Sequence, residues 1–231
     1  MQLRIRASLR FPLEGADWGR KLFLGGGTGL LLELVFVGVA YLVNEEIGFG
    51  VAPLVVFLNF PAVGYVLRVF RGTLRWETGA LPEWDDWPAL TRGGLTVSVV
   101  ALAYGILPIL ILLLGLNLLV RGGIILFLGM LLMVLGLLVG LFVLFFLPMA
   151  LAYLLARRRL EAAFHPSLLW DGINSVLAEY MATYLISVAT YIMAGLLAAV
   201  PYLGLLVSPF VFYYLMLVQA RLFGEICART V

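Results

Sequence analysis

The chain has 231 residues, of which 64% are hydrophobic and only 12% are charged. Its mean hydropathy of +1.10 excludes a water-soluble domain of this size, because such a domain needs enough polar residues to cover its exterior. The 15 Lys+Arg residues nearly balance the 13 Asp+Glu residues. One cysteine, Cys227, and one histidine, His165, cannot form a zinc or haem ligand cluster. We therefore expect an integral membrane protein with no cofactor and no nucleic-acid partner.

Long charge-poor windows follow one another along the chain. About 20 apolar helical residues cross a hydrocarbon core about 30 Å thick, and unbroken runs of this length exclude a β-barrel. The sequence thus predicts an all-α bundle of about six spans, arranged as three hairpins with amphipathic segments at the membrane surface. The expected spans are Leu22–Val43, Ile47–Phe70, Leu95–Leu116, Ile125–Ala156, Val176–Ala199 and Leu203–Phe223.

The fourth window, Ile125–Ala156, is too long for an upright crossing, since its helix would reach about 48 Å at the standard rise. We expect it to bend at Pro148 or to protrude from the membrane. The stretch Gly115–Gly129, with Arg121, is predicted as an interfacial or re-entrant piece rather than a simple loop.

Basic residues gather in alternate loops. Every Lys and Arg except Arg121 falls before the first span, at the end of the second span or between it and the third, between the fourth and fifth, or at the C-terminal end of the last span and beyond it. Arg121 shares its side with the acidic turn Asn44-Glu45-Glu46. The positive-inside rule therefore predicts that both termini lie in the cytoplasm of a cell membrane.

Residues 1–10 alternate between apolar and polar side chains with a period of two, which indicates a short extended segment. The arginines of this segment either contact anionic headgroups or only set the topology of a frayed terminus.

Three segments that combine tryptophan with acidic residues each precede a pair of spans. They are Asp17-Trp18, Glu83–Trp87 and Trp170-Asp171. We interpret residues 1–231 as one membrane domain built from approximate repeat units at 11–75, 81–160 and 164–226. The alternative is that tryptophan simply prefers membrane interfaces.

A few short motifs resemble those of a known family. The most specific is Leu81-Pro82-Glu83-Trp84-Asp85-Asp86-Trp87, and the others are Phe11-Pro12 with Asp17-Trp18, Ala162-Ala163-Phe164, and Ser208-Pro209. At these residues the chain resembles the membrane family catalogued as domain of unknown function 4013, whereas His165-Pro166 and Trp170 match it loosely. The resemblance implies a multi-pass bacterial or archaeal membrane protein of unassigned activity, and it brings no catalytic residues.

Two acidic residues form a candidate intramembrane polar site. Glu33 lies near the middle of the first span, where a carboxylate is costly unless it faces protein, water or a partner. On the fifth span, Glu179, Thr183 and Ser187 share one helical face with Ser175 and Thr190. This face either lines a hydrated pathway with Glu33 or hydrogen-bonds neighbouring helices.

The loop before the third span carries candidate interfacial anchors. Trp84 and Trp87 are typical of side chains that lie at the headgroups, and Asp85 and Asp86 lie between them. Two adjacent carboxylates are too few to specify a divalent cation, so we expect no metal site.

No catalytic motif is present, which indicates a protein that is not an enzyme. We expect a membrane-embedded partner, scaffold or lipid-organising component that contacts membrane lipids and either another membrane protein or a second copy of itself. The alternative is a small transporter or channel for protons or cations that uses Glu33 and the polar face of the fifth span.

Overall fold

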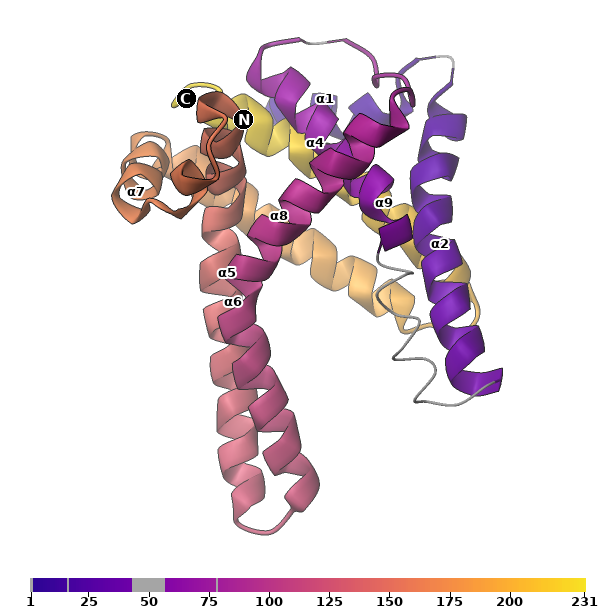
Figure 1. The fold of residues 1–231 in the computed structure, drawn as a ribbon, viewed down its shortest axis with the longest axis vertical. Helices are drawn as coiled ribbons and strands as arrows, with labels where there is room; N and C mark the ends of the chain where they lie inside the picture. Colours follow the sequence, from indigo (N-terminus) through magenta and orange to yellow (C-terminus); the bar gives the residue numbers. More distant parts are fainter. Residues whose placement is uncertain (1, 16, 43–56, 78) are drawn as a thin grey trace. The chain divides into compact units, whose positions relative to one another are not determined.

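The structure is a computed structural model that describes residues 2–15, 17–42, 57–77 and 79–231 (Figure 1). The described residues are 85% helical and form no strand, which confirms the all-α prediction. The elements are α1 (Gln2–Arg10), η1 (Phe11–Leu13), α2 (Trp18–Leu42), α4 (Phe60–Leu74), α5 (Trp87–Arg121), α6 (Ile125–Arg157), η2 (Leu160–Phe164), α7 (Pro166–Ser175), α8 (Leu177–Ala198) and α9 (Leu203–Cys227).

Four of the described helices, α5, α6, α8 and α9, are long and apolar enough to cross a membrane. They correspond to the last four predicted spans. The first predicted span lies in α2, which is not among the four, and the second begins outside the described residues and continues only into α4. Four of the six predicted spans are thus found, in the described part of the chain, as helices long and apolar enough to cross a membrane.

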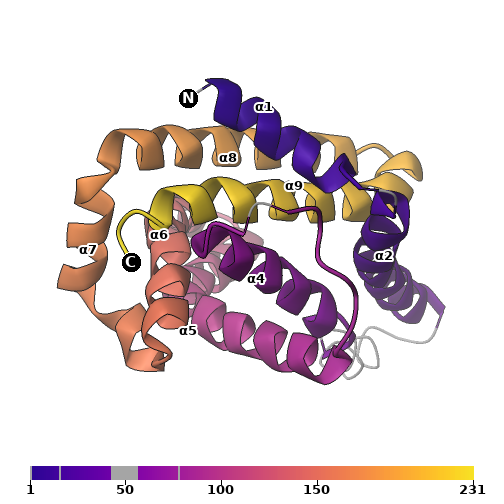
Figure 2. The same ribbon diagram turned by 90° about the horizontal axis from the view of Figure 1, so that it is seen from above.

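Residues 1–97 and 172–231 form one compact unit, and residues 98–171 form a second. In the first unit α9 is the central helix, because it packs against α1, α2, α4 and α8. Figure 2 shows α9 lying between α8 and α4. The apolar window of α9 is 44% buried, against 17% for that of α8. Small residues of α9 permit this packing: a Cβ added to Gly224 would lie 2.7 Å from Cβ of Thr73 on α4.

The prediction of an extended segment at residues 1–10 is wrong, because α1 is helical from Gln2 to Arg10. Leucine, arginine, glutamine and alanine all favour helices, so the alternation of polar and apolar side chains was a poor guide to this segment. The helix also packs against α9, where the Tyr214 hydroxyl donates to the Leu9 carbonyl and Ser8 is buried.

In the second unit, α6 lies beside the C-terminal part of α5 (Figure 1). The helices are joined by Gly122 and Gly123, whose φ angles of 68° and 62° suit glycine. Because α5 continues to Arg121 and α6 begins at Ile125, the expected re-entrant piece at residues 115–129 is instead two helix ends and a tight turn. A Cβ on Gly129 would lie 2.7 Å from the Leu119 nitrogen, so the helices approach closely there.

The fourth predicted span, Ile125–Ala156, is confirmed as a helix that extends to Arg157 and continues through Pro148. Its exposed large apolar side chains occur from Ile125 to Leu144, which is about 30 Å of helix and matches the hydrocarbon thickness. Beyond Pro148 the helix is mostly buried, and α6 packs against η2. The C-terminal end of α6, which exceeds the length needed to cross the hydrocarbon core, is therefore covered by other parts of the chain.

Candidate functional site

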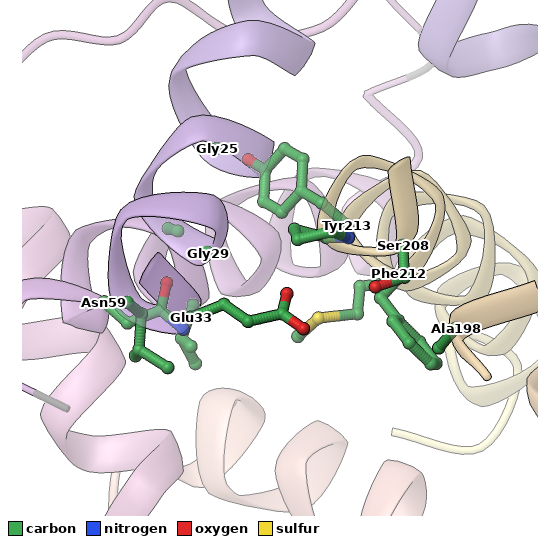
Figure 3. Close-up of a pocket in the computed structure, with 13 residues that line it drawn as sticks. Gly25, Gly29, Glu33, Asn59, Ala198, Ser208, Phe212 and Tyr213 are labelled. Atoms are coloured by element: carbon green, nitrogen blue, oxygen red, sulfur yellow. The ribbon is translucent and has the colours of Figure 1, made fainter. Parts of the chain in front are cut away.

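A cavity of about 310 Å³ lies between α2, α4 and α9 in the first unit. Its polar groups come from Glu33, Asn59 and Ser208. Figure 3 shows the Glu33 side chain reaching from α2 toward Phe212 of α9. Tyr213 adds a hydroxyl group that is buried without a hydrogen-bond partner among the described residues. The remaining lining is apolar or bare backbone: Gly25, Gly29, Leu32, Ala62, Val63, Ala198, Pro209, Phe212 and Met216.

Two glycines on α2 shape the side of the cavity that faces α9. The ring of Tyr213 lies against Gly25, where an added Cβ would be 1.9 Å from the ring carbon Cζ (Figure 3). At Gly29 an added Cβ would be 3.3 Å from Cβ of Pro209. Both glycines thus allow α9 to pack closely on α2. Thr28, between them, has one hydroxyl proton to share between the Gly25 carbonyl oxygen at 2.7 Å and Asn59 Oδ1 at 3.2 Å, and the contact with Asn59 ties α2 to the start of α4.

Glu33 forms no ion pair or hydrogen bond with any described residue. Lys21 is bound to Glu83, and Arg221 is bound to Glu225. A carboxyl group without a cation partner therefore faces a mostly carbon-lined cavity, which is the arrangement that makes intramembrane acids candidates for function.

Glu179 is not brought to this cavity. It lies in the first turn of α8, and its Oε2 accepts a hydrogen bond from Arg229 at 2.9 Å, beyond the C-terminal end of α9. The cavity reaches only to Met216 on α9, and about 16 Å of helix rise separates Met216 from Cys227. A relay that joins Glu33 directly to Glu179 has no support in this geometry.

Two hydroxyl groups of the predicted polar face bond to carbonyl groups of their own helix. Ser187 donates to the Thr183 carbonyl at 2.8 Å, and Thr190 donates to the Ser187 carbonyl at 2.9 Å. Thr183 and Ser187 are buried, as expected for a face that turns inward. Hydroxyls that bond locally do not form a polar pathway by themselves.

The Leu81–Trp87 loop is held on α2 and α4 by a set of polar contacts that the sequence did not predict. Lys21 Nζ on α2 donates to the Leu81 carbonyl at 2.8 Å and to Glu83 Oε1 at 2.6 Å. Tyr65 Oη donates to the Pro82 carbonyl at 2.6 Å. These partners are more than a dozen residues apart in sequence, so no local motif could have revealed them.

The two adjacent aspartates of the loop serve different elements. Asp85 forms an ion pair with Arg68 of α4, whose guanidinium group donates a hydrogen bond to the Asp85 carboxylate. This hydrogen bond lowers the pKa of Asp85. Asp86 accepts a hydrogen bond from the Ala89 amide at 3.3 Å and so caps α5. No group of three potential metal-ligating side chains occurs among the described residues.

The tryptophans of the loop also differ. Trp84 stacks on Tyr65 with ring centroids 4.5 Å apart and an angle of 11° between the planes, so its ring packs against protein. Trp87 is 46% exposed at the start of α5 and is the better placed of the two for the predicted role of an interfacial anchor.

We expect Lys21→Met to lower the free energy of unfolding by about 1–3 kcal/mol, because it removes both hydrogen bonds from a buried ammonium group to the loop. Glu83→Gln should cost less than about 1 kcal/mol, since the Glu83 side chain is 70% exposed. Thermal unfolding and limited proteolysis of the loop would measure both effects. Equal stability of Lys21→Met and wild type would show that the loop is not held by Lys21.

A serine lies beside His165, the one histidine of the sequence. Ser167 Oγ is 3.3 Å from His165 Nδ1, and both residues are exposed. The contact joins neighbours in sequence and is long, and no hydrogen bond or ion pair joins the histidine to a described acid. A nucleophile, a base and an orienting group are all needed for triad chemistry, so this pair gives no support for a hydrolase.

These features define an all-helical protein whose long apolar helices indicate a membrane location. The family model described as protein of unknown function (DUF4013) matches residues 47–207, and the chain belongs to that family. Leu81–Trp87 and Ala162–Phe164, two of the motifs that carried the resemblance, lie inside the matched region. No curated protein and no solved structure matches the chain.

Proposed function

We propose that this protein is a non-catalytic, membrane-embedded partner of other integral membrane proteins. In such a complex it acts as a scaffold or as a lipid-organising component. One observation carries the proposal. Gly195, near the C-terminal end of α8, and Ala199, the residue that follows this helix, are both exposed, and nothing lies within 4 Å of a Cβ added at Gly195. Small residues four apart on an uncovered helix let a second membrane helix approach closely.

In this proposal the chain has six spans in three hairpins in a prokaryotic cell membrane, with both termini in the cytoplasm. The distribution of arginines supports that orientation. The second unit supports the spans, because the α5–α6 hairpin has the length of a bilayer core and carries large exposed apolar side chains.

The experiment is a mild-detergent pull-down followed by native mass spectrometry, carried out on wild type and Gly195→Leu. Wild type should recover a second membrane protein or a second copy of the chain. Gly195→Leu should lose that partner and keep the thermal stability of wild type, because the new side chain meets open space within the fold. The matched control, Leu196→Ala, shortens an exposed side chain nearby and should retain the partner.

Recovery of bare monomer from wild type, under conditions that preserve known membrane complexes, would contradict the proposal. Equal recovery of the partner with Gly195→Leu would show that this face of α8 is not the contact. The alternative function, a small transporter or channel, required both Glu33 and Glu179 in one pathway. Only Glu33 lines the cavity, because Glu179 is paired with Arg229 outside it.

A further inference from the structure

We propose that the cavity beside Glu33 binds a small apolar molecule that carries one protonated amine, with the Glu33 carboxylate as its counter-ion. The cavity belongs entirely to the first unit and is formed by α2, α4, α9 and the end of α8. This inference is independent of the partner role proposed for α8.

The charge of Glu33 favours a cationic ligand. The carboxyl group of Glu33 projects into the cavity, and no described residue pairs with it (Figure 3). Two cations of the helices that line the cavity, Lys21 on α2 and Arg68 on α4, do not pair with Glu33. Both are bound to the Leu81–Trp87 loop. An unpaired carboxylate in an apolar setting is stabilised by a cation from outside the chain.

The donor set favours an organic cation over a metal ion. Hard metal cations take six or more oxygen ligands in most protein sites. Besides Glu33, the polar side chains of the cavity are Ser208, Asn59 and Tyr213, and Asn59 Oδ1 already accepts a hydrogen bond from Thr28. An ammonium group needs no more than three acceptors, which the Glu33 carboxylate and the Ser208 hydroxyl can largely supply.

The walls and the volume define the rest of the ligand. Leu32, Pro209, Phe212 and Met216 present carbon and sulfur, which suit a hydrocarbon body. The volume of about 310 Å³ holds about ten groups of the size of water. A phenyl ring on a two-carbon amine therefore fits, whereas a whole phospholipid is too large.

The test measures binding of phenethylamine, and of its neutral analogue phenethyl alcohol, to the full-length protein in lipid nanodiscs. Equilibrium dialysis against empty nanodiscs subtracts partitioning into lipid. We expect the amine to bind at least tenfold more tightly than the alcohol. Glu33→Gln should weaken amine binding by about ten- to a hundredfold and leave alcohol binding unchanged, because it keeps the shape and removes the charge.

Two further variants complete the test. Glu179→Gln, which alters an acid paired with Arg229 outside the cavity, should bind the amine as wild type does. Val63→Phe fills the cavity and keeps Glu33, and it should abolish binding of both compounds. Circular dichroism and size-exclusion chromatography verify that each variant is folded.

Equal affinity for the amine and the alcohol in wild type would overturn the proposal. Undiminished amine binding by Glu33→Gln or by Val63→Phe would overturn it as well. If Glu33→Gln does not fold, the comparison of the two compounds and the Val63→Phe result decide the question. The partner role has its own test at Gly195, so the failure of either proposal is recognised separately.

Discussion

Gly64→Ala is expected to destabilise the fold by about 3 kcal/mol or more and to lower the midpoint of thermal unfolding by about 10 °C. A Cβ at Gly64 on α4 would lie 1.8 Å from the Leu90 carbonyl oxygen of α5. The reciprocal contact is equally close, since a Cβ at Gly94 would lie 1.9 Å from the Phe60 carbonyl oxygen. Backbone atoms cannot rotate away, so the two helices would have to separate.

Differential scanning fluorimetry of the purified protein measures this effect. Gly27→Ala is the matched control, because Gly27 is also helical and nothing lies within 4 Å of its added Cβ. The control should be neutral or more stable by up to about 1 kcal/mol, since alanine favours helices. Wild-type stability of Gly64→Ala would contradict the close crossing of α4 and α5.

Gly25→Ala should also destabilise the fold, by about 2 kcal/mol. The new methyl group would occupy the space of the Tyr213 ring, which is buried between α2 and α9. The ring is a side chain and can shift, so the loss should be smaller than at Gly64.

A double-mutant cycle tests this packing contact directly. Tyr213→Ala alone should cost about 3–5 kcal/mol through the cavity that it leaves. In that background Gly25→Ala should cost almost nothing, because the clashing ring is gone. Additive losses in the cycle would show that the ring does not lie against Gly25.

Apolar run length predicted α6 almost to the residue, because nothing polar interrupts residues 125–156. It underestimated α5, which begins at Trp87 and not at Leu95. The extra turns contain Arg92 and are capped by Asp86, so they are helical without being a membrane window. Hydropathy detects burial in lipid, whereas helix ends are determined by capping and by contacts with neighbouring elements.

The candidate site was predictable only in part. Glu33 stood out because an acid in an apolar run is costly, and it does line the cavity. Asn59 and Ser208 lie far from it in sequence and join it only through the packing of α2, α4 and α9. Glu179 was grouped with Glu33 because both fell within predicted spans. Its place in the first turn of α8 and its contact with Arg229 depend on the tertiary fold.

The most direct test of the central claim, that the α5–α6 hairpin spans the membrane from the cytoplasm, is cysteine accessibility in intact cells. Cys227→Ala removes the native cysteine, which is buried. Single cysteines then replace Arg121, at the end of α5, and Arg159, just beyond α6. A membrane-impermeant maleimide should label Arg121→Cys in intact cells and Arg159→Cys only after permeabilisation. Labelling of both positions in intact cells, or of Arg159→Cys alone, would contradict this topology.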